Sequence, residues 1–138
     1  MNEKAKPLDQ SNKEIKEYEI KGIKFVPCMS LNMVFMAGVD LAGASLYYVN
    51  FANSLFAGAN LSGVDFSFAN LVYVDFAGAN MSFAKLDSAN LRGANLAHAR
   101  LDDADLTGAD LSYANLTSTN LEGAIMTGTI LTGVNWPR

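Results

Sequence analysis

Large apolar residues recur at every fifth position of this 138-residue chain, from Leu31 to Trp136. Neither the 3.6-residue repeat of a helix nor the two-residue repeat of a flat strand gives this spacing. A fixed short period is typical of a solenoid, in which each repeat packs on its neighbours. We call the large apolar residue the central residue of its repeat. The series is Leu31, Met36, Leu41, Leu46, Phe51, Phe56, Leu61, Phe66, Leu71, Phe76, Met81, Leu86, Leu91, Leu96, Leu101, Leu106, Leu111, Leu116, Leu121, Met126, Leu131 and Trp136.

The other positions of the repeat are also regular. Two residues before the central residue the side chain is small in every repeat except the first, which has Met29 there. The residue just before the central one is mostly Asn or Asp, and the second residue after it is often Gly. The glycines at this position are Gly38, Gly43, Gly58, Gly63, Gly78, Gly93, Gly108, Gly123, Gly128 and Gly133.

The glycine pattern has a physical explanation. A type II turn needs a positive φ at its third residue, which Gly tolerates best. One such turn every five residues winds the chain into a coil with flat sides. If the central and the small residue both face inward, they fill the core, while Asn and Asp face outward beside the turns. The predicted core is Leu41, Leu46, Phe51, Phe56, Leu61, Phe66, Leu71, Phe76, Met81, Leu86, Leu91, Leu96 and Leu101.

The motifs AGANLSGVDF, VDFAGANMSF and ANLRGANLAHARLDDADLTGADLSYANLTSTNLEGA resemble the pentapeptide-repeat family, whose consensus is A(D/N)LXX. The resemblance covers residues 29–138. It implies an all-β fold, a right-handed quadrilateral parallel β-helix with four repeats per coil and about five and a half coils. Residues twenty apart should therefore stack in columns along the rod.

The first 28 residues lack the repeat. Residues 1–11 are expected to be flexible, and residues 12–28 to cap the open N-terminal end of the solenoid. Ser11 to Glu14 fits a capping box, so a short helix is predicted over residues 12–19. Residues 20–26 are predicted to form a strand that ends at Pro27. This cap is expected to cover Phe35 and Leu55, which stand at outward positions twenty residues apart.

Composition and charge limit the location and the kinds of partner that we expect for this chain. No apolar run approaches the ~20 residues of a membrane span, and the charged N-terminus is no signal peptide. Cys28 is the only cysteine, so no intrachain disulfide forms, and both features favour the cytoplasm; a leader trimmed from the chain is the alternative. Residues 1–28 hold six Lys and five acids, which leaves nine acids and four bases, or −5, in the repeats. This acidic balance argues against direct nucleic-acid binding.

No catalytic or cofactor motif stands out. His98 is the only histidine, and a lone histidine cannot build a zinc site with Cys28, outside the regular repeats. The sequence has no phosphate loop, no GxGxxG and no HExxH. The uninterrupted phase leaves no long loop from which to build a cleft. We expect no enzyme activity, metal or cofactor.

Two outward surfaces are candidates for partners. The first is an aromatic patch, which aromatic ladders between coils would also explain. The second is a C-terminal rim, where Ile125 and Ile130 replace the usual Asn or Asp. An open end with an apolar rim favours a two-fold, tail-to-tail dimer; a monomer with Trp136 folded over its own end is the alternative. The candidate partner patch is Tyr47, Tyr48, Phe68, Val72, Tyr73 and Phe83, and the candidate dimer rim is Ile125, Met126, Ile130, Leu131 and Trp136.

Two functions of different class remain. A rigid rod without a pocket favours a protein-binding or scaffold module. The family resemblance suggests instead a DNA mimic that modulates DNA gyrase or topoisomerase, as fluoroquinolone-resistance factors of this family do. Rows of negative charge are needed for mimicry, yet the outward columns hold more Asn than Asp. The sequence therefore favours the binding module.

Overall fold

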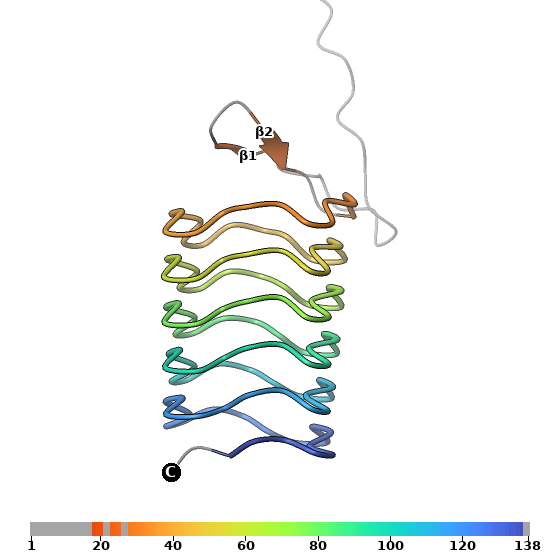
Figure 1. The fold of residues 1–138 in the computed structure, drawn as a ribbon, viewed down its shortest axis with the longest axis vertical. Helices are drawn as coiled ribbons and strands as arrows, with labels where there is room; N and C mark the ends of the chain where they lie inside the picture. The colour runs from red at the N-terminus through yellow and green to blue at the C-terminus, as the bar shows by residue number, and fades with distance from the viewer. Residues whose placement is uncertain (1–17, 21–22, 26–27, 137–138) are drawn as a thin grey trace, which may run out of the picture.

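The computed structural model describes residues 18–20, 23–25 and 28–136, so the predictions for residues 1–17 lie outside the described residues. From residue 28 onward the chain winds into a straight rod of stacked coils (Figure 1). Residues twenty apart form parallel β-bridges, for example Asp40 with Asn60 and Asn60 with Asn80. Each coil therefore holds four five-residue repeats and bonds only to the coils beside it. The right-handed sense of the coil stays a prediction from the family resemblance.

Each repeat ends in a turn of the predicted kind. The amide of the small residue donates to the carbonyl of the preceding central residue, as Ala79 does to Phe76 at 2.9 Å. The second residue after the central one has a positive φ, 66° at Gly78 and 57° at Tyr73. This combination is the signature of a type II turn. The same backbone angle therefore holds at described positions where the sequence has no glycine.

The backbone hydrogen bonds explain why Asn and Asp precede the central residue. In one repeat, the amide of Val74 closes a turn, and the amide of Asp75 donates to the preceding coil. The amides of Phe76 and Gly78 donate to the following coil. The remaining amide, that of Ala77, donates to the Asp75 carboxylate at 2.9 Å. Asn or Asp thus supplies the one acceptor that the stacked backbone lacks.

The core follows the inward rows. Leu41 is 3% exposed, and the other residues of the predicted core are 0% exposed. The phenylalanines make a continuous aromatic cluster: Phe56 lies 5.0 Å from Phe51 and 5.8 Å from Phe76 between ring centroids. The small residues, such as Ala79, are buried with them. Large and small side chains therefore share the interior of every coil.

Hydroxyl groups replace a few of the small apolar residues, and each finds a partner. Thr119 Oγ1 donates to the carbonyl of Leu96 at 2.7 Å. Ser54 is 0% exposed; its hydroxyl accepts from the amide of Val34 at 3.1 Å and donates to the carbonyl of Leu31 at 3.2 Å. Ser54 thereby bridges the one turn whose ends do not bond directly. No buried side-chain nitrogen or oxygen of the described residues lacks a hydrogen bond.

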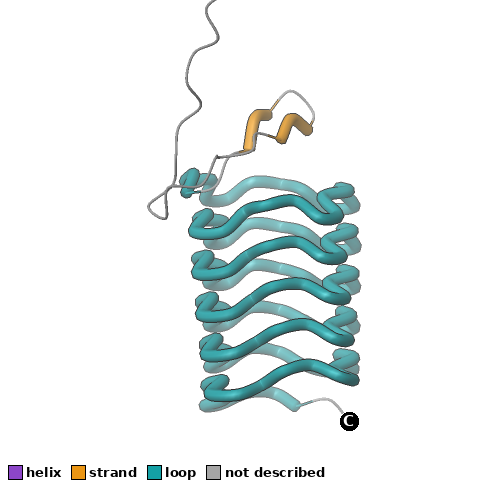
Figure 2. The backbone as a smooth tube through the Cα atoms, turned by 180° about the vertical axis from the view of Figure 1, so that it is seen from behind, coloured by secondary structure: helices purple, strands orange, loops and turns teal. Residues whose placement is uncertain are grey.

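The N-terminal segment differs from the prediction. Strands β1 (Tyr18–Ile20) and β2 (Ile23–Phe25) pair antiparallel, with Tyr18 opposite Phe25. This hairpin lies beyond the first coil (Figure 2). The helix predicted over 12–19 is wrong at its last two residues, and the single strand predicted over 20–26 is wrong because the chain folds back. The alternation of apolar and polar residues on both sides of Gly22 has the period of strands. The capping box itself lies outside the described residues.

The solenoid also includes Cys28, one residue earlier than predicted. Cys28 has a φ of 66°, and its amide donates to the carbonyl of Tyr47 in the next coil at 3.2 Å. Phe35 pairs with Leu55 as the column register requires. Phe35 is nevertheless 77% exposed, so the described residues do not cover it as expected.

Candidate functional site

The described part of the rod offers surfaces and no recognisable reaction centre. It contains no group of three or more His, Cys, Asp or Glu side chains placed to hold a metal ion. It also contains no helix of the length and apolarity that a bilayer crossing requires. His98 stands exposed at a turn with a φ of 59°. The unfavourable features of this surface are aromatic side chains that are exposed to water and stand at turn residues of positive φ.

Three residues of the predicted aromatic patch lie together. The rings of Tyr48 and Phe68 stack, with centroids 4.9 Å apart and planes inclined by 6°. Tyr47 meets Tyr48 edge to face at 6.3 Å and 82°. The stacking distance equals the ~4.8 Å rise between paired chains, so the two rings stack along the rod axis. Tyr48 is 45% and Phe68 48% exposed, so the pair both braces adjacent coils and faces solvent.

The other three residues of the predicted patch lie elsewhere. Val72 is half-buried, and Tyr73 stands at the next turn, one repeat after Phe68. Phe83 stands three repeats after Phe68 and makes no ring contact with any described residue. Because every repeat turns the chain onto another side of the rod, nearness in sequence does not make one surface. Ring contacts within the patch therefore join only Tyr47, Tyr48 and Phe68 among the described residues, and the full patch stays a prediction.

Tyrosine and glycine alternate along a second row of turns. The ring of Tyr73 occupies the space that a side chain on Gly93 would need, and the ring of Tyr113 does the same above Gly133. The guanidinium of Arg92 lies 5.5 Å from the ring centroid of Tyr113. The missing side chain of each glycine is thus what lets a tyrosine lie flat against the next coil.

The loss of stability when a turn glycine is replaced by alanine should therefore depend on the side chain twenty residues earlier. Gly78 and Gly93 have φ values of 66° and 67°, but nothing lies near the Cβ position of Gly78. We expect Gly78→Ala to cost about 1–2 kcal/mol from backbone strain alone. Gly93→Ala should cost more, because the Tyr73 ring must also move. Thermal unfolding measures both, and adding Tyr73→Ala should bring the cost of Gly93→Ala down to that of Gly78→Ala. If Gly78→Ala and Gly93→Ala cost the same while Tyr73 is still present, the contact between Tyr73 and Gly93 is contradicted.

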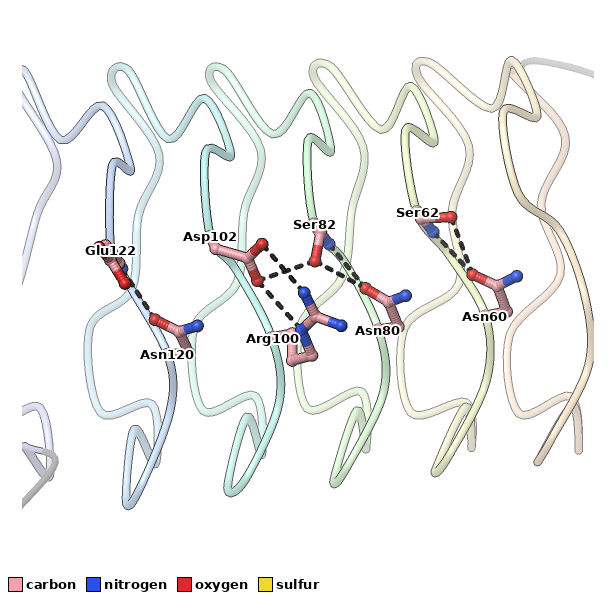
Figure 3. Close-up of polar contacts among 8 residues, drawn as sticks. All are labelled: Asn60, Ser62, Asn80, Ser82, Arg100, Asp102, Asn120 and Glu122. Atoms are coloured by element: carbon pink, nitrogen blue, oxygen red, sulfur yellow. Dashed lines mark hydrogen bonds and ion pairs between the residues drawn. The ribbon is translucent and has the colours of Figure 1, made fainter.

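On one side of the rod polar side chains recur from coil to coil, and those of two coils are joined by a hydrogen bond (Figure 3). The Ser82 hydroxyl lies 2.8 Å from Asn80 Oδ1 and 2.8 Å from Asp102 Oδ1. Arg100 donates twice to the Asp102 carboxylate, at 3.2 Å each. The Ser82 hydroxyl, followed by Arg100, holds the pKa of Asp102 below its ordinary 3.8. These contacts tie two adjacent coils together.

Two further carboxylates are stabilised in their charged form. The Thr107 hydroxyl, 2.6 Å from the Asp105 carboxylate, lowers the pKa of Asp105. Burial raises the pKa of Asp110, but bonds from Ser112 and the nearby Arg92 outweigh it, so that pKa is also lowered. Arg92 Nη1 lies 3.4 Å from Asp110 Oδ2.

Acid should therefore destabilise the rod. A folded-state pKa below the unfolded value stabilises the fold above the unfolded pKa, and this stability is lost as the pH falls through the folded value. We expect the unfolding temperature to begin to drop below a pH of about 4. NMR titration of the Asp105 carboxyl gives the direct check: Thr107→Val should raise its pKa towards 3.8, the ordinary value. An unchanged titration in this variant would exclude the hydroxyl as the cause.

The predicted C-terminal rim is apolar and has unpaired backbone groups. Ile125 is 51%, Ile130 48% and Trp136 49% exposed, and Met126 and Leu131 are half-buried. In earlier coils the central amide donates to the following coil, but within the described residues these amides have no partner in the last coil. The carbonyls of the small residues there are unpaired as well. The unpaired groups include the amides of Leu121, Met126 and Leu131 and the carbonyls of Ala124, Thr129 and Val134.

Comparison with known proteins agrees with this architecture. A family model described as pentapeptide repeats matches residues 36–67, 59–97 and 99–135, in eight copies. The solved pentapeptide repeat protein Rfr23 from the cyanobacterium Cyanothece 51142 is 25% identical, with 79% of this chain and 88% of Rfr23 covered and a TM-score of 0.77.

Other solved structures are less similar in shape. A pentapeptide repeat protein of the Arabidopsis thaliana thylakoid lumen is 28% identical, covering 75% of this chain and 61% of its own, with a TM-score of 0.36. The plasmid-mediated fluoroquinolone resistance protein QnrB1, in a trypsin-treated form, is 17% identical, covering 79% and 77%, with a TM-score of 0.34. No curated protein matches significantly. On the family match, this chain belongs to the pentapeptide repeat family.

Proposed function

We propose that this protein is a non-enzymatic rod that binds another protein through the stacked Tyr48–Phe68 pair. Both residues have a positive φ, 58° and 59°, at a turn position where glycine is the default. A side chain with this backbone costs roughly 1–2 kcal/mol, and each ring also leaves nearly half of its surface in water. Two unfavourable features at one place favour a contact role, since exposed aromatic surface and local strain both concentrate at binding sites.

The test replaces the rings with the residue that the turn prefers. Tyr48→Gly with Phe68→Gly removes the aromatic pair and relieves the backbone strain, so the rod should stay folded. Tyr113→Gly is the matched control, because it removes an exposed ring from another turn. We expect wild-type protein and the control to retain the same protein from an extract of the source cells, and the double variant to lose it. Retention by the double variant would refute the proposed surface.

The alternative function is a DNA mimic that modulates DNA gyrase or topoisomerase. Its support is the acidic balance of the rod, with nine acids and four bases in residues 29–138. Part of that charge is neutralised within the rod, since Asp102 pairs with Arg100 and Asp110 with Arg92. A supercoiling assay with purified gyrase separates the two functions. Inhibition or protection at micromolar rod would favour mimicry, and no effect would remove it.

We also propose that two copies of the rod pair end to end through the C-terminal rim. On this edge the central amide and the carbonyl two residues before it are both unpaired. In an antiparallel sheet, two opposite residues of a non-hydrogen-bonded pair are flanked by such groups. The preceding residue supplies a C=O and the following residue an N–H, and both bond to the other strand. A two-fold axis across the rod would let each copy satisfy the other, and Ile125, Ile130 and Trp136 would be buried between them.

Oligomeric state tests this assembly. Ile130 ends a column of residues twenty apart that includes Asn90 and Asp110. We expect Ile130→Asp to convert a dimer into a monomer in sedimentation velocity. Asn90→Asp adds the same charge to the same column, two coils away from the rim, and should leave the dimer intact. A monomeric wild-type protein, or a dimer that tolerates Ile130→Asp, would exclude this interface.

A further inference from the structure

We propose that the turn at Phe68 binds an arginine side chain of the partner protein. The guanidinium would lie over the free face of the Phe68 ring and against the carboxylates of Asp65 and Asp87. This inference rests on the proposed function, because it uses the same surface and adds the chemistry of the partner. Three observations carry it: a half-exposed ring that stacks on one described ring, two carboxylates without an ion pair to a described residue, and an internal example of a guanidinium that contacts both a ring and a carboxylate.

Only one face of the Phe68 ring stacks on another ring of the described residues. Tyr48 covers the face towards the N-terminal end of the rod, at 4.9 Å. The next residue in this row of turns is Ser88, whose side chain is too small to cover a ring. Phe68 is accordingly 48% exposed. A positively charged group is attracted to such a face by the quadrupole of the ring.

Two carboxylates flank Ser67, the residue before Phe68. Asp65 Oδ1 and Asp87 Oδ1 lie 2.6 Å and 2.7 Å from the Ser67 hydroxyl oxygen. A hydroxyl has one proton, so Ser67 can donate to only one of them at a time. Lys85 pairs with Asp65 through the backbone, yet its side chain forms no ion pair with any described residue. Two negative charges therefore stand together without a cation.

The backbone holds the carboxylates and the ring in one place. The amide of Phe68 donates to the carbonyl of Asp87 in the next coil at 3.0 Å. Ser67 and Phe68 are neighbours in sequence, and Ser88 follows Asp87. A cation over the ring would thus meet carboxylate oxygen at its edge without any rearrangement of the rod.

The protein contains a related arrangement with its own arginine, which reaches its ring from the N-terminal side of the rod rather than the C-terminal side. Arg92 lies over the Tyr113 ring at 5.5 Å and pairs with Asp110 at 3.4 Å. Asp110 and Tyr113 are three residues apart, as Asp65 and Phe68 are. The position that corresponds to Arg92, eighteen residues before the acid, is Tyr47 in the Asp65 repeat. One acid–aromatic pair therefore has a cation within the chain, and the other does not.

The geometry favours arginine over lysine. A planar guanidinium can stack on a ring and donate to carboxylate oxygens in its own plane at the same time. An ammonium group is more strongly hydrated and cannot lie flat on the ring. The acids on both sides of Ser67 make an acidic partner segment unfavourable.

The first test is an NMR titration of the full chain with the peptide N-acetyl-Gly-Arg-Gly-amide at low salt. We expect the amide signals of Phe68, Asp87 and Ser88 to shift, and the shifts to shrink as salt is added. Asp87→Asn should weaken binding by about fivefold. The matched peptide with Glu in place of Arg should shift none of these signals.

A second variant supplies the cation from the chain itself. Ser88→Arg places a guanidinium beside the free face of the Phe68 ring, so the peptide should no longer bind. Ser118→Arg is the matched control: Ser88 and Ser118 both have a positive φ, 57° and 54°, so the backbone cost of the two changes is the same. Ser118 lies in a different row of turns, and this variant should bind the peptide like the wild type.

Three results would overturn the inference. They are an absence of shifts at about 10 mM arginine peptide, equal shifts with the glutamate peptide, and full binding by Ser88→Arg. None of them decides the proposed function, which the capture experiment with the ring-deleted variant tests separately. If capture depends on Tyr48 and Phe68 while the arginine peptide fails, only the partner chemistry assigned here is wrong.

Discussion

Phe76→Ala is expected to destabilise the rod by about 3–5 kcal/mol. Phe76 is 0% exposed, and its ring packs against Phe56 at 5.8 Å and Phe66 at 6.3 Å between centroids. Removing the ring takes away its transfer free energy and leaves a cavity between stacked coils that cannot close independently. Urea unfolding followed by circular dichroism measures the loss, with fluorescence of Trp136 as a second probe at the C-terminal end.

Phe76→Leu is the control for this prediction. The next inward residue of the same column, twenty residues on, is Leu96, which is also fully buried. The variant therefore repeats a side chain that the rod already accommodates one coil later, and we expect a cost well below that of alanine. A loss of less than 1 kcal/mol in Phe76→Ala, comparable to a surface change, would show that the phenylalanine cluster is not the core. Disagreement between the two probes would show that coils unfold separately.

Ala94→Leu is expected to destabilise the rod by at least about 1–3 kcal/mol, although leucine is the commonest central residue of the repeats. Ala94 is 0% exposed and occupies the small inward position, where the coils above and below leave no space. The added carbons would push neighbouring side chains out of their rotamers or separate the coils. Thermal unfolding of the purified variant measures the effect.

Ala97→Leu is the matched change on the outside. Ala97 lies three residues later in the same coil, half-buried at an outward position. Because its side chain points away from the core, we expect a change within about 0.5 kcal/mol. Similar costs at the two alanines would mean that the inward and outward positions are assigned wrongly. The pair therefore tests the winding of the chain with two identical substitutions.

The period of five predicted most of the rod. It specified which side chains point inward, that Gly38 or Gly78 stands at a turn of positive φ, and that residues twenty apart pair. These features depend only on local backbone geometry repeated without interruption, so the sequence pattern contains them. The capping of each free amide by Asn or Asp was visible as a preference, but its reason required the hydrogen bonds of the stacked coils.

Features that depend on a single contact were not predictable in this way. The helix predicted over residues 12–19 was based on the capping box, whereas residues 18–20 form β1 and pair with β2. The opening of the Leu31–Val34 turn depends on one buried hydroxyl, that of Ser54. The nesting of Tyr73 over Gly93 has a signal, since bulky and absent side chains alternate at twenty-residue steps, but only the coordinates show in which direction the ring lies.

The candidate surface was predicted in part. Tyr47, Tyr48 and Phe68 come together because two of them share a row of turns and the third is a neighbour in sequence. Phe83 stands in the row of turns next to theirs, one repeat before Ser88, but its ring contacts no described ring. The two carboxylates that lie close to the Ser67 hydroxyl were not predicted as a pair, because they belong to different coils and different positions of the repeat.

The register of twenty residues has a consequence for how such a protein can change its length. Each coil bonds only to its immediate neighbours, and any coil begins and ends at equivalent points. Duplicating or losing one complete lap would therefore return every later residue to its former orientation. A gain or loss of one residue would instead turn all subsequent leucines out of the interior. Changes in rod length should consequently be accommodated best in whole laps, which keep both the inward rows and the twenty-residue columns.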